Sequence, residues 1–199
     1  FGAATKFSQL HLDADKTYVA TAQLGVRTST GDAEGERFSE RPVSVSADDL
    51  ARVALQFTGP IRQVPPMHSA LKKDGKALYE YAREGVEVER APRDVVIHEL
   101  ALAFEPDFEQ SRRIRIEARV SKGTYIRTLG EDIGEALGCG AHLTSLRRTE
   151  TGGFTQDQCV SVEALEAMGE DERLARLLPP EALVADHARV TLEPEDAGR

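Results

Sequence analysis

A strictly alternating segment followed at once by a helical one constrains the fold of this chain more than any other feature. From Arg112 to Val120, apolar residues occupy every second position, which is the period of a half-buried strand. After the heptapeptide Ser-Lys-Gly-Thr-Tyr-Ile-Arg at 121–127, apolar residues recur at helical spacing as far as Leu137. Gly138 follows where a left-handed C-cap is expected. The sequence therefore predicts a strand, a tight turn and a helix.

Arg127 falls in the first turn of this predicted helix. A cation there faces the positive end of the helix dipole, at a cost of about 0.3–1 kcal/mol. We therefore expect an acidic group close to Arg127. Tyr125 lies in the same connection and Tyr18 in another predicted strand. Tyrosines on such faces are more often core or rim residues than functional ones, so the residues alone leave both roles open.

The remaining segments mix strands and helices in no regular order. Strands are predicted at 16–24, 93–104 and 142–149, and a further one begins near Arg189. Helices are predicted at 1–12, 46–57 with Ser46 as N-cap, 77–84, 162–168 and 172–178. A polar loop is predicted at 25–36, an extended segment at 63–71, a basic turn at 72–76 and a boundary at Pro179-Pro180. We expect the strand at 93–104 to pair with 114–120. Because strands and crossover helices do not alternate, the fold is predicted to be α+β, with a mixed, mostly antiparallel sheet flanked by helices.

Charge is distributed unevenly along the 199 residues, whose net charge is −9. The last fifty residues carry 12 acidic and 4 basic side chains, so the rest is close to neutral and its cations are clustered. Such a chain is compatible with a nucleic-acid partner, because the local patch governs binding. No apolar run approaches the ~20 residues of a membrane span. With Cys139 and Cys159 read as reduced thiols, we expect a cytoplasmic protein without a membrane partner.

Patterns of metal, nucleotide or nucleophile chemistry are few. The five histidines are scattered, and none stands at ligand spacing from a cysteine or carboxylate, so no metal site is expected. The glycines at 138 and 140 follow a helix, which is the wrong context for a phosphate loop. Composition leaves a serine–histidine–acid triad open, although no nucleophile elbow is present.

Two basic clusters favour a nucleic-acid interface. The first combines Lys72, Lys73, Lys76 and Arg83 with Tyr79 and Tyr81. The second combines Arg112, Arg113, Arg115, Arg119 and Lys122 with Arg147 and Arg148. Aromatic rings that stack on bases, beside cations that follow phosphates, are typical of proteins that bind single-stranded or loop RNA. A solvated strand face and a solvated helix explain the same charges equally well.

Taken together, several segments resemble the bacterial tRNA pseudouridine synthase B family, densely over residues 1–150 and loosely beyond. The matching segments are 1–7 (Phe-Gly-Ala-Ala-Thr-Lys-Phe), 15–18 (Asp-Lys-Thr-Tyr), 24–32 (Leu-Gly-Val-Arg-Thr-Ser-Thr-Gly-Asp), 63–72 (Gln-Val-Pro-Pro-Met-His-Ser-Ala-Leu-Lys), 78–83 (Leu-Tyr-Glu-Tyr-Ala-Arg), 121–128 and 137–143 (Leu-Gly-Cys-Gly-Ala-His-Leu). Several long motifs in one order are far more specific than any one of them.

The resemblance implies an enzyme that isomerises a uridine in the T loop of tRNA, uridine 55, to pseudouridine by base flipping and covalent aspartate catalysis. It implies a pseudouridine synthase catalytic-domain fold and no metal or organic cofactor. Tyr18 would pack on the flipped base and assist proton removal, Tyr125 and Leu146 would line the pocket, and Arg127 would pair with the catalytic aspartate. Asp32 matches a family position near the substrate. The RNA-binding residues would be Lys72, Lys73, Lys76, Arg83, Lys122, Arg147 and Arg148.

The family's nucleophilic aspartate belongs to a motif upstream of Phe1 and has no counterpart here. Asp13, Asp15 and Asp32 lie in other motifs. We therefore expect residues 1–178 to be a catalytic domain without its N-terminal part, carrying an RNA-gripping insertion at about 60–92. Residues 179–199 would be a linker and the start of a truncated C-terminal RNA-binding domain. We expect a monomer. The parent would be a tRNA-modifying isomerase, and the alternative is a catalytically inactive RNA-binding fragment.

Overall fold

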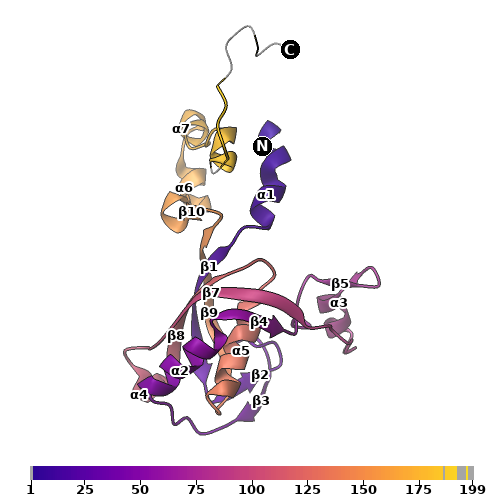
Figure 1. Cartoon of the computed structure of the whole chain (residues 1–199), viewed down its shortest axis with the longest axis vertical. Helices are drawn as coiled ribbons and strands as arrows, with labels where there is room; N and C mark the ends of the chain where they lie inside the picture. The colour runs from indigo at the N-terminus through magenta and orange to yellow at the C-terminus, as the bar shows by residue number, and fades with distance from the viewer. Residues whose placement is uncertain (1, 186, 192–195, 197–199) are drawn as a thin grey trace. The chain divides into compact units, whose positions relative to one another are not determined.

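The computed structural model describes residues 2–185, 187–191 and 196 (Figure 1). The chain divides into two compact units, which are described separately. One unit comprises Phe1–Asp13 with Cys159–Arg199, and the other comprises Ala14–Gln158. The predicted division after residue 178 stays a prediction.

The larger unit is built on a six-stranded sheet whose neighbouring strands are all antiparallel. In spatial order the strands are β10 (Phe154–Thr155), β9 (Ala141–Thr151), β1 (Lys16–Leu24), β8 (Arg113–Val120), β7 (Arg93–Phe104) and β4 (Gly59–Gln63). The predicted α+β class is therefore confirmed. The predicted pairing of 93–104 with 114–120 is also confirmed, with Ile116 opposite Leu102.

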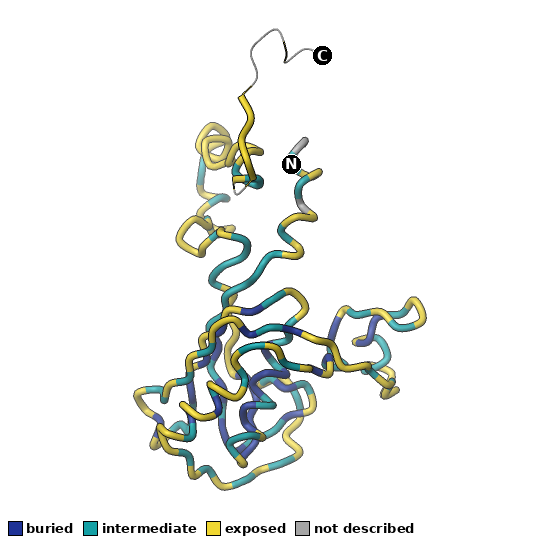
Figure 2. The backbone as a smooth tube through the Cα atoms, viewed as in Figure 1, coloured by how far each residue is buried: buried dark blue, intermediate teal, exposed yellow. Residues whose placement is uncertain are grey.

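Two helices cover one face of this sheet, and the core lies beneath them. Helix α5 (Ile126–Ala136) packs on β9 and β1, and α2 (Ala47–Phe57) packs on β7. Ser46 begins α2 with a capping box, as its hydroxyl accepts from the Asp49 N–H over 3.2 Å. Every second residue of β8 is buried and faces the helices, so that β8 forms part of the sheet side of the core. Figure 2 shows the buried residues of this unit gathered along the central strands and α5.

Helix α5 lies very close to β9 because it has a glycine at the contact. A Cβ atom added to Gly134 would come within 2.3 Å of the Ala141 backbone nitrogen, so only glycine fits there. The predicted C-cap also occurs, since Gly138 adopts φ +82° just past the helix.

Smaller elements branch from this framework. β2 (Val26–Thr28) and β3 (Arg37–Glu40) form a hairpin; β2 lies within the segment predicted as a polar loop, and β3 directly follows that segment. Between β4 and β7 lies an insertion with the hairpin β5 (Lys72–Lys73) and β6 (Lys76–Ala77), followed by α3 (Leu78–Arg83). The predicted extended segment at 63–71 is wrong in its second half, which bends over 67–70. Each proline fixes its own φ and restricts the residue before it, so neither constrains residues 67–70. α4 (Phe108–Ser111) and the 3-10 turn η2 (Gln156–Gln158) complete the unit.

The smaller unit is helical in its described part. It contains η1 (Gly2–Phe7), α1 (Ser8–Leu12), α6 (Val162–Ala167), α7 (Glu170–Ala175) and η3 (Pro180–Val184). The predicted helix at 172–178 begins earlier, because the Glu172 carboxylate accepts from the Gly169 N–H at its N-terminus over 3.0 Å, and it ends earlier, at Ala175. The strand expected from Arg189 does not form over 189–191, and Leu192 lies outside the described residues. Within the described ranges, every helix is too short or too polar to cross a membrane.

Candidate active site and RNA interface

Arg127 lies at the start of α5 and joins three segments of the larger unit. Its guanidinium donates from Nη1 to the Asp32 carboxylate over 3.0 Å and from Nη2 to the His68 carbonyl over 2.6 Å. A longer contact of 3.4 Å runs from Nη1 to the Thr30 carbonyl. The Arg127 side chain is 25 % exposed and that of Asp32 is 27 % exposed, so both charges remain partly open to solvent.

Asp32 is the acidic group that the helix-dipole reasoning required. It lies in the turn between β2 and β3, where its Oδ1 accepts from the Thr30 hydroxyl over 2.6 Å and from the Glu34 N–H over 3.2 Å. Burial raises the pKa of the Asp32 carboxyl. The hydrogen bonds from Thr30 and Glu34 and the charge of Arg127 outweigh burial, so the pKa lies below its usual value.

Both oxygens of Asp32 are therefore engaged, one by the turn and one by Arg127. A carboxylate held in this way is suited to orient a cation, and it is poorly suited to attack a substrate. The family resemblance predicts a partner for Arg127 upstream of Phe1, and that pairing stays a prediction. In the structure, Asp32 is a partner within the chain.

Tyr18 and Leu146 lie on the same face of the sheet, which is the face that α5 covers. Tyr18 shares its side of β1 with the buried Ala20, and Leu146 of β9 is the register partner of Ala20. Leu146 is 47 % exposed, and it lies within a run of exposed β9 residues at 144–148. Tyr18 is half-buried against the core, and the register with β9 shifts directly before it, between Thr17 and Tyr18. Tyr125 occupies the N-cap position of α5, directly before the first helical turn.

The two arginines of β9 point to opposite faces. Arg148 is the register partner of Tyr18 and shares its face, whereas Arg147 is the partner of Val19 and lies on the other side. Both are exposed, as is Lys122 in the turn before α5. Among these three predicted RNA-binding residues, register brings only Arg148 onto the face of Tyr18.

The strand cations of the second basic cluster are paired with acids. Arg113 bonds to Asp107 over 2.9 Å, Arg115 to Glu117 over 2.7 Å and Arg119 to Asp15 over 3.1 Å. Arg112, which precedes the strand, lies 3.3 Å from Glu109. Of the two interpretations left open by the sequence, this pairing favours a solvated sheet face over an RNA-binding surface.

The first basic cluster lies on the insertion, and its members differ. Lys76 is ion-paired with Glu84 and lies 4.6 Å from the centre of the Tyr81 ring. Arg83 lies 5.2 Å from the centre of the Tyr79 ring, which is partly exposed. These are cation–π distances.

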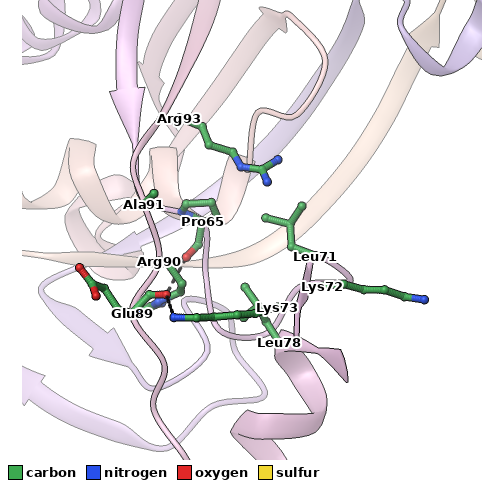
Figure 3. Close-up of a pocket in the computed structure, with 9 residues that line it drawn as sticks. All are labelled: Pro65, Leu71, Lys72, Lys73, Leu78, Glu89, Arg90, Ala91 and Arg93. Carbon is green, nitrogen blue, oxygen red and sulfur yellow. Dashed lines mark hydrogen bonds between the residues drawn. The ribbon is translucent and has the colours of Figure 1, made fainter. Parts of the chain in front are cut away.

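Lys72 and Lys73 border a cavity of about 430 Å³ at the base of the insertion (Figure 3). Pro65, Leu71 and Leu78 line it with apolar surface, and Arg90 and Arg93 add two further cations. Lys73 donates to the Glu89 carbonyl over 2.8 Å. Within the described part of the chain, none of Lys72, Lys73 and Arg93 forms an ion pair with a carboxylate.

Sequence reasoning missed three contributors to the site: the Thr30 hydroxyl, the His68 carbonyl and the side chain of Arg93. A Thr-x-Asp turn is a local signal that could have identified Thr30. A backbone carbonyl carries no such signal. Over the described residues, no group of three or more His, Cys, Asp or Glu side chains could hold a metal ion.

Comparisons with known proteins agree on one family. Residues 1–126 match the TruB family pseudouridylate synthase N-terminal domain, and residues 127–185 match the tRNA pseudouridylate synthase B C-terminal domain. The chain is 57% identical over 202 residues to the tRNA pseudouridine synthase B of Verminephrobacter eiseniae (strain EF01-2), covering 100% of this chain and 61% of that protein. It is 58% identical over 200 residues to the same enzyme of Ralstonia nicotianae (strain ATCC BAA-1114 / GMI1000), covering 100% of this chain and 63% of that one. The chain thus spans less than two thirds of the length of these relatives.

Among solved structures, the fold is similar to a chain in the crystal structure of a Cbf5-Nop10-Gar1 complex, with a TM-score of 0.64 and 26% identity. The match covers 90% of this chain and 46% of that one. A second similarity supports the fold alone. It is to the structure of an H/ACA RNP bound to a substrate RNA containing 2'-deoxyuridine, with a TM-score of 0.59, 24% identity and coverage of 90% and 44%. On the family matches and the close relatives, the chain belongs to the TruB family of pseudouridine synthases.

Proposed function

We propose that this chain is part of a tRNA pseudouridine synthase and carries most of its uridine site. The reaction would convert uridine 55 of the T loop to pseudouridine. The proposal rests on the Arg127–Asp32 pair at the start of α5. This pair holds a cation on the sheet face that α5 covers, beside β1, which carries Tyr18. Relatives named tRNA pseudouridine synthase B, at 53–58% identity, support the substrate class.

The reaction breaks the bond from the ribose C1′ to N1 of uracil and forms a bond from C1′ to C5. C5 then loses its proton and N1 gains one from solvent, so that the product is an isomer of uridine. A base inside a folded loop must leave its stack first, at a cost of a few kcal/mol. Tyr18, Tyr125 and Leu146 would hold the extruded uracil by apolar contact, and Tyr18 would assist removal of the C5 proton.

Arg127 would hold the nucleophilic aspartate, which we propose comes from sequence outside these 199 residues. Asp32 occupies one side of the guanidinium through Nη1 and His68 fixes Nη2, so the cation is already oriented. The Arg127 charge would keep the pKa of the incoming carboxyl low and the nucleophile ionised. Asp32 is proposed as the orienting group.

We propose that the insertion between β4 and β7 contacts the RNA backbone through Lys72, Lys73 and Arg93 around the cavity of Figure 3. Cations without carboxylate partners are free to replace the counterions of phosphates, whereas Lys76 is already paired with Glu84. Arg83, Lys122, Arg147 and Arg148 would add weaker contacts. The insertion would span about 60–92 of a catalytic domain over 1–178, and 179–199 would begin an RNA-binding domain.

We propose further that the whole enzyme is a cytoplasmic monomer that uses no metal or organic cofactor and does not associate with membranes. A second candidate function applies to the isolated chain. Because both oxygens of Asp32 are engaged, we propose that the chain alone binds RNA and forms no pseudouridine.

The test uses a T-arm stem-loop with uridine at position 55 and detects pseudouridine by mass spectrometry after chemical derivatisation. The full-length protein should modify that uridine in multiple turnovers. The isolated 199 residues should bind the same RNA without product. Absence of product with the full-length protein would contradict the proposed function, and product with the isolated chain would contradict the external nucleophile.

A further inference from the structure

A buried glutamine joins the end of β4 to the start of α5. Gln63 is the last residue of β4 and is 2 % exposed. Its Nε2 donates to the Tyr125 carbonyl over 3.1 Å, and its Oε1 accepts from the Tyr125 N–H over 2.9 Å. A buried amide is destabilising unless it is hydrogen-bonded, and here both ends are satisfied by one residue. The pair also fixes the amide orientation, because only one assignment matches donor to acceptor at both ends.

Tyr125, whose peptide groups form both hydrogen bonds with Gln63, lies at an N-terminus that has no side-chain cap. Tyr125 is the N-cap of α5, with φ −99° and ψ 110°, and its own side chain makes no capping hydrogen bond. Gln63 therefore holds the peptide groups of Tyr125 as a neighbouring strand would. The side chain of Tyr125 and the first turn that carries Arg127 both project from this point.

The same segment is attached to α5 a second time. Five residues after Gln63, the His68 carbonyl accepts from Arg127 over 2.6 Å. The segment that leads into the insertion is thus bonded to the start of α5 at two points, through Tyr125 and, two residues later, through Arg127.

We propose that Gln63 is a positioning residue for uridine isomerisation, a role that rests on the proposed function. Its amide sets the main chain of Tyr125, which places the aromatic ring against the uracil and places Arg127 for the nucleophile. The alternative to a positioning role is that Gln63 only stabilises the core. If Gln63 positions Tyr125, loss of the hydrogen-bond donor at Nε2 should lower turnover while RNA affinity and the fold stay constant. If Gln63 only stabilises the core, turnover should not depend on that donor in a folded variant.

Gln63→Glu in the full-length protein separates these roles, because glutamate has nearly the same shape. When ionised, the new side chain keeps an acceptor for the Tyr125 N–H and opposes the Tyr125 carbonyl with a second negative oxygen. When protonated, it regains a donor. We expect kcat at pH 8 to fall by about tenfold or more while the Kd for the T-arm stem-loop stays within about twofold. The ratio of variant to wild-type kcat should rise as pH falls toward 5.5.

Two further variants complete the experiment. Gln110→Glu makes the same chemical change at an exposed position of α4, and it should match the wild type at every pH. Gln63→Met removes both hydrogen bonds without adding charge, and it should lower kcat at every pH to a similar extent. Circular dichroism and thermal unfolding, measured at each pH, report whether each variant is folded.

Wild-type kcat in folded Gln63→Glu and Gln63→Met, or a Gln63→Glu ratio that does not change with pH, would overturn the positioning role. Unfolding of both Gln63 variants would assign Gln63 to stability and overturn it as well. These outcomes differ from failure of the proposed function, in which the wild-type protein itself forms no pseudouridine and both proposals fall.

Discussion

The Arg127 guanidinium and the Asp32 carboxylate form an ion pair of 3.0 Å across 95 positions of sequence. The pair offsets the unfavourable location of a cation at the N-terminus of α5. It also leaves the guanidinium partly exposed, on the sheet face that carries Tyr18 and Leu146. A stability role alone requires no such exposure.

Asp32→Asn should lower turnover of the full-length enzyme without weakening RNA binding. The amide keeps the shape of the turn but removes the charge that orients Arg127. We expect kcat to fall by about 10- to 100-fold, with the Kd for the T-arm stem-loop within about twofold. Glu34→Gln is the matched control, since the Glu34 side chain is exposed and only its N–H contacts Asp32. Equal effects from both variants would contradict an orienting role.

Asp132 on α5 should make stability depend on pH. Burial, and then the neighbouring Glu131 and Glu135 carboxylates, raise the pKa of Asp132 to about 6, although Arg27 opposes the shift. The folded pKa lies above the unfolded value of 3.8, so the folded state binds the proton more tightly. The contribution of Asp132 to the free energy of unfolding is therefore most favourable below pH 4, and it is lost as pH rises through 6.

Asp132→Asn should remove that loss. Because the group is partly exposed, we expect a gain of only about 1 kcal/mol in the free energy of unfolding at pH 8, and little change at pH 4. Urea unfolding at both pH values measures it. Asp94→Asn, at a side chain that is 93% exposed, is the control. A gain in Asp132→Asn that is the same at both pH values would show that the carboxylate charge is not the cause.

Gly134→Ala should destabilise the larger unit more than Gly138→Ala. The added Cβ at Gly134 would meet backbone atoms of Gly140 and Ala141, so α5 would have to move from β9 at a cost of about 1–3 kcal/mol or more. At Gly138 the space is open, and only the positive φ opposes alanine, by roughly 1 kcal/mol. Chemical denaturation of the full-length protein compares the two. Equal losses would mean that the close approach of α5 to β9 is not tight in solution.

Replacing Lys72, Lys73 and Arg93 together by alanine should weaken T-arm binding and flatten its salt dependence. Each lost phosphate contact reduces the slope of log K against log salt by roughly 0.7–0.9. Lys76→Ala should change the slope by less, because Glu84 already neutralises Lys76. Fluorescence anisotropy over a salt series measures both. An unchanged slope in the triple variant would show that these cations are merely solvated.

Much of the sheet could be predicted because strands such as β1 and β8 alternate between buried and more exposed positions. β8 alternates strictly, and α2 and α5 carry regular apolar stripes between recognisable caps. β4 was missed because Gly59 and Pro60 read as helix breakers. Proline is nevertheless tolerated on an edge strand, and β4 is the edge of this sheet. The β2–β3 hairpin was missed because turn formers dominate its sequence.

The site could be predicted only in part. The location of Arg127 on a helix N-terminus required an acid, but nothing local identified which one. Asp32 reaches Arg127 because its turn lies beside β9, where Asp32 bridges to Leu143. Likewise the pairing of Gln63 with Tyr125 depends on sheet order, which places the end of β4 near the end of β8 through β7.

The most direct test of the central claim is the effect of Arg127→Ala on single-turnover pseudouridine formation by the full-length enzyme, measured together with T-arm affinity. If Arg127 orients the nucleophile, the rate constant should fall by about 1,000-fold or more while the Kd changes by less than about threefold. Equal losses of rate and affinity would contradict the account, because Arg127 would then be an RNA-binding or folding residue.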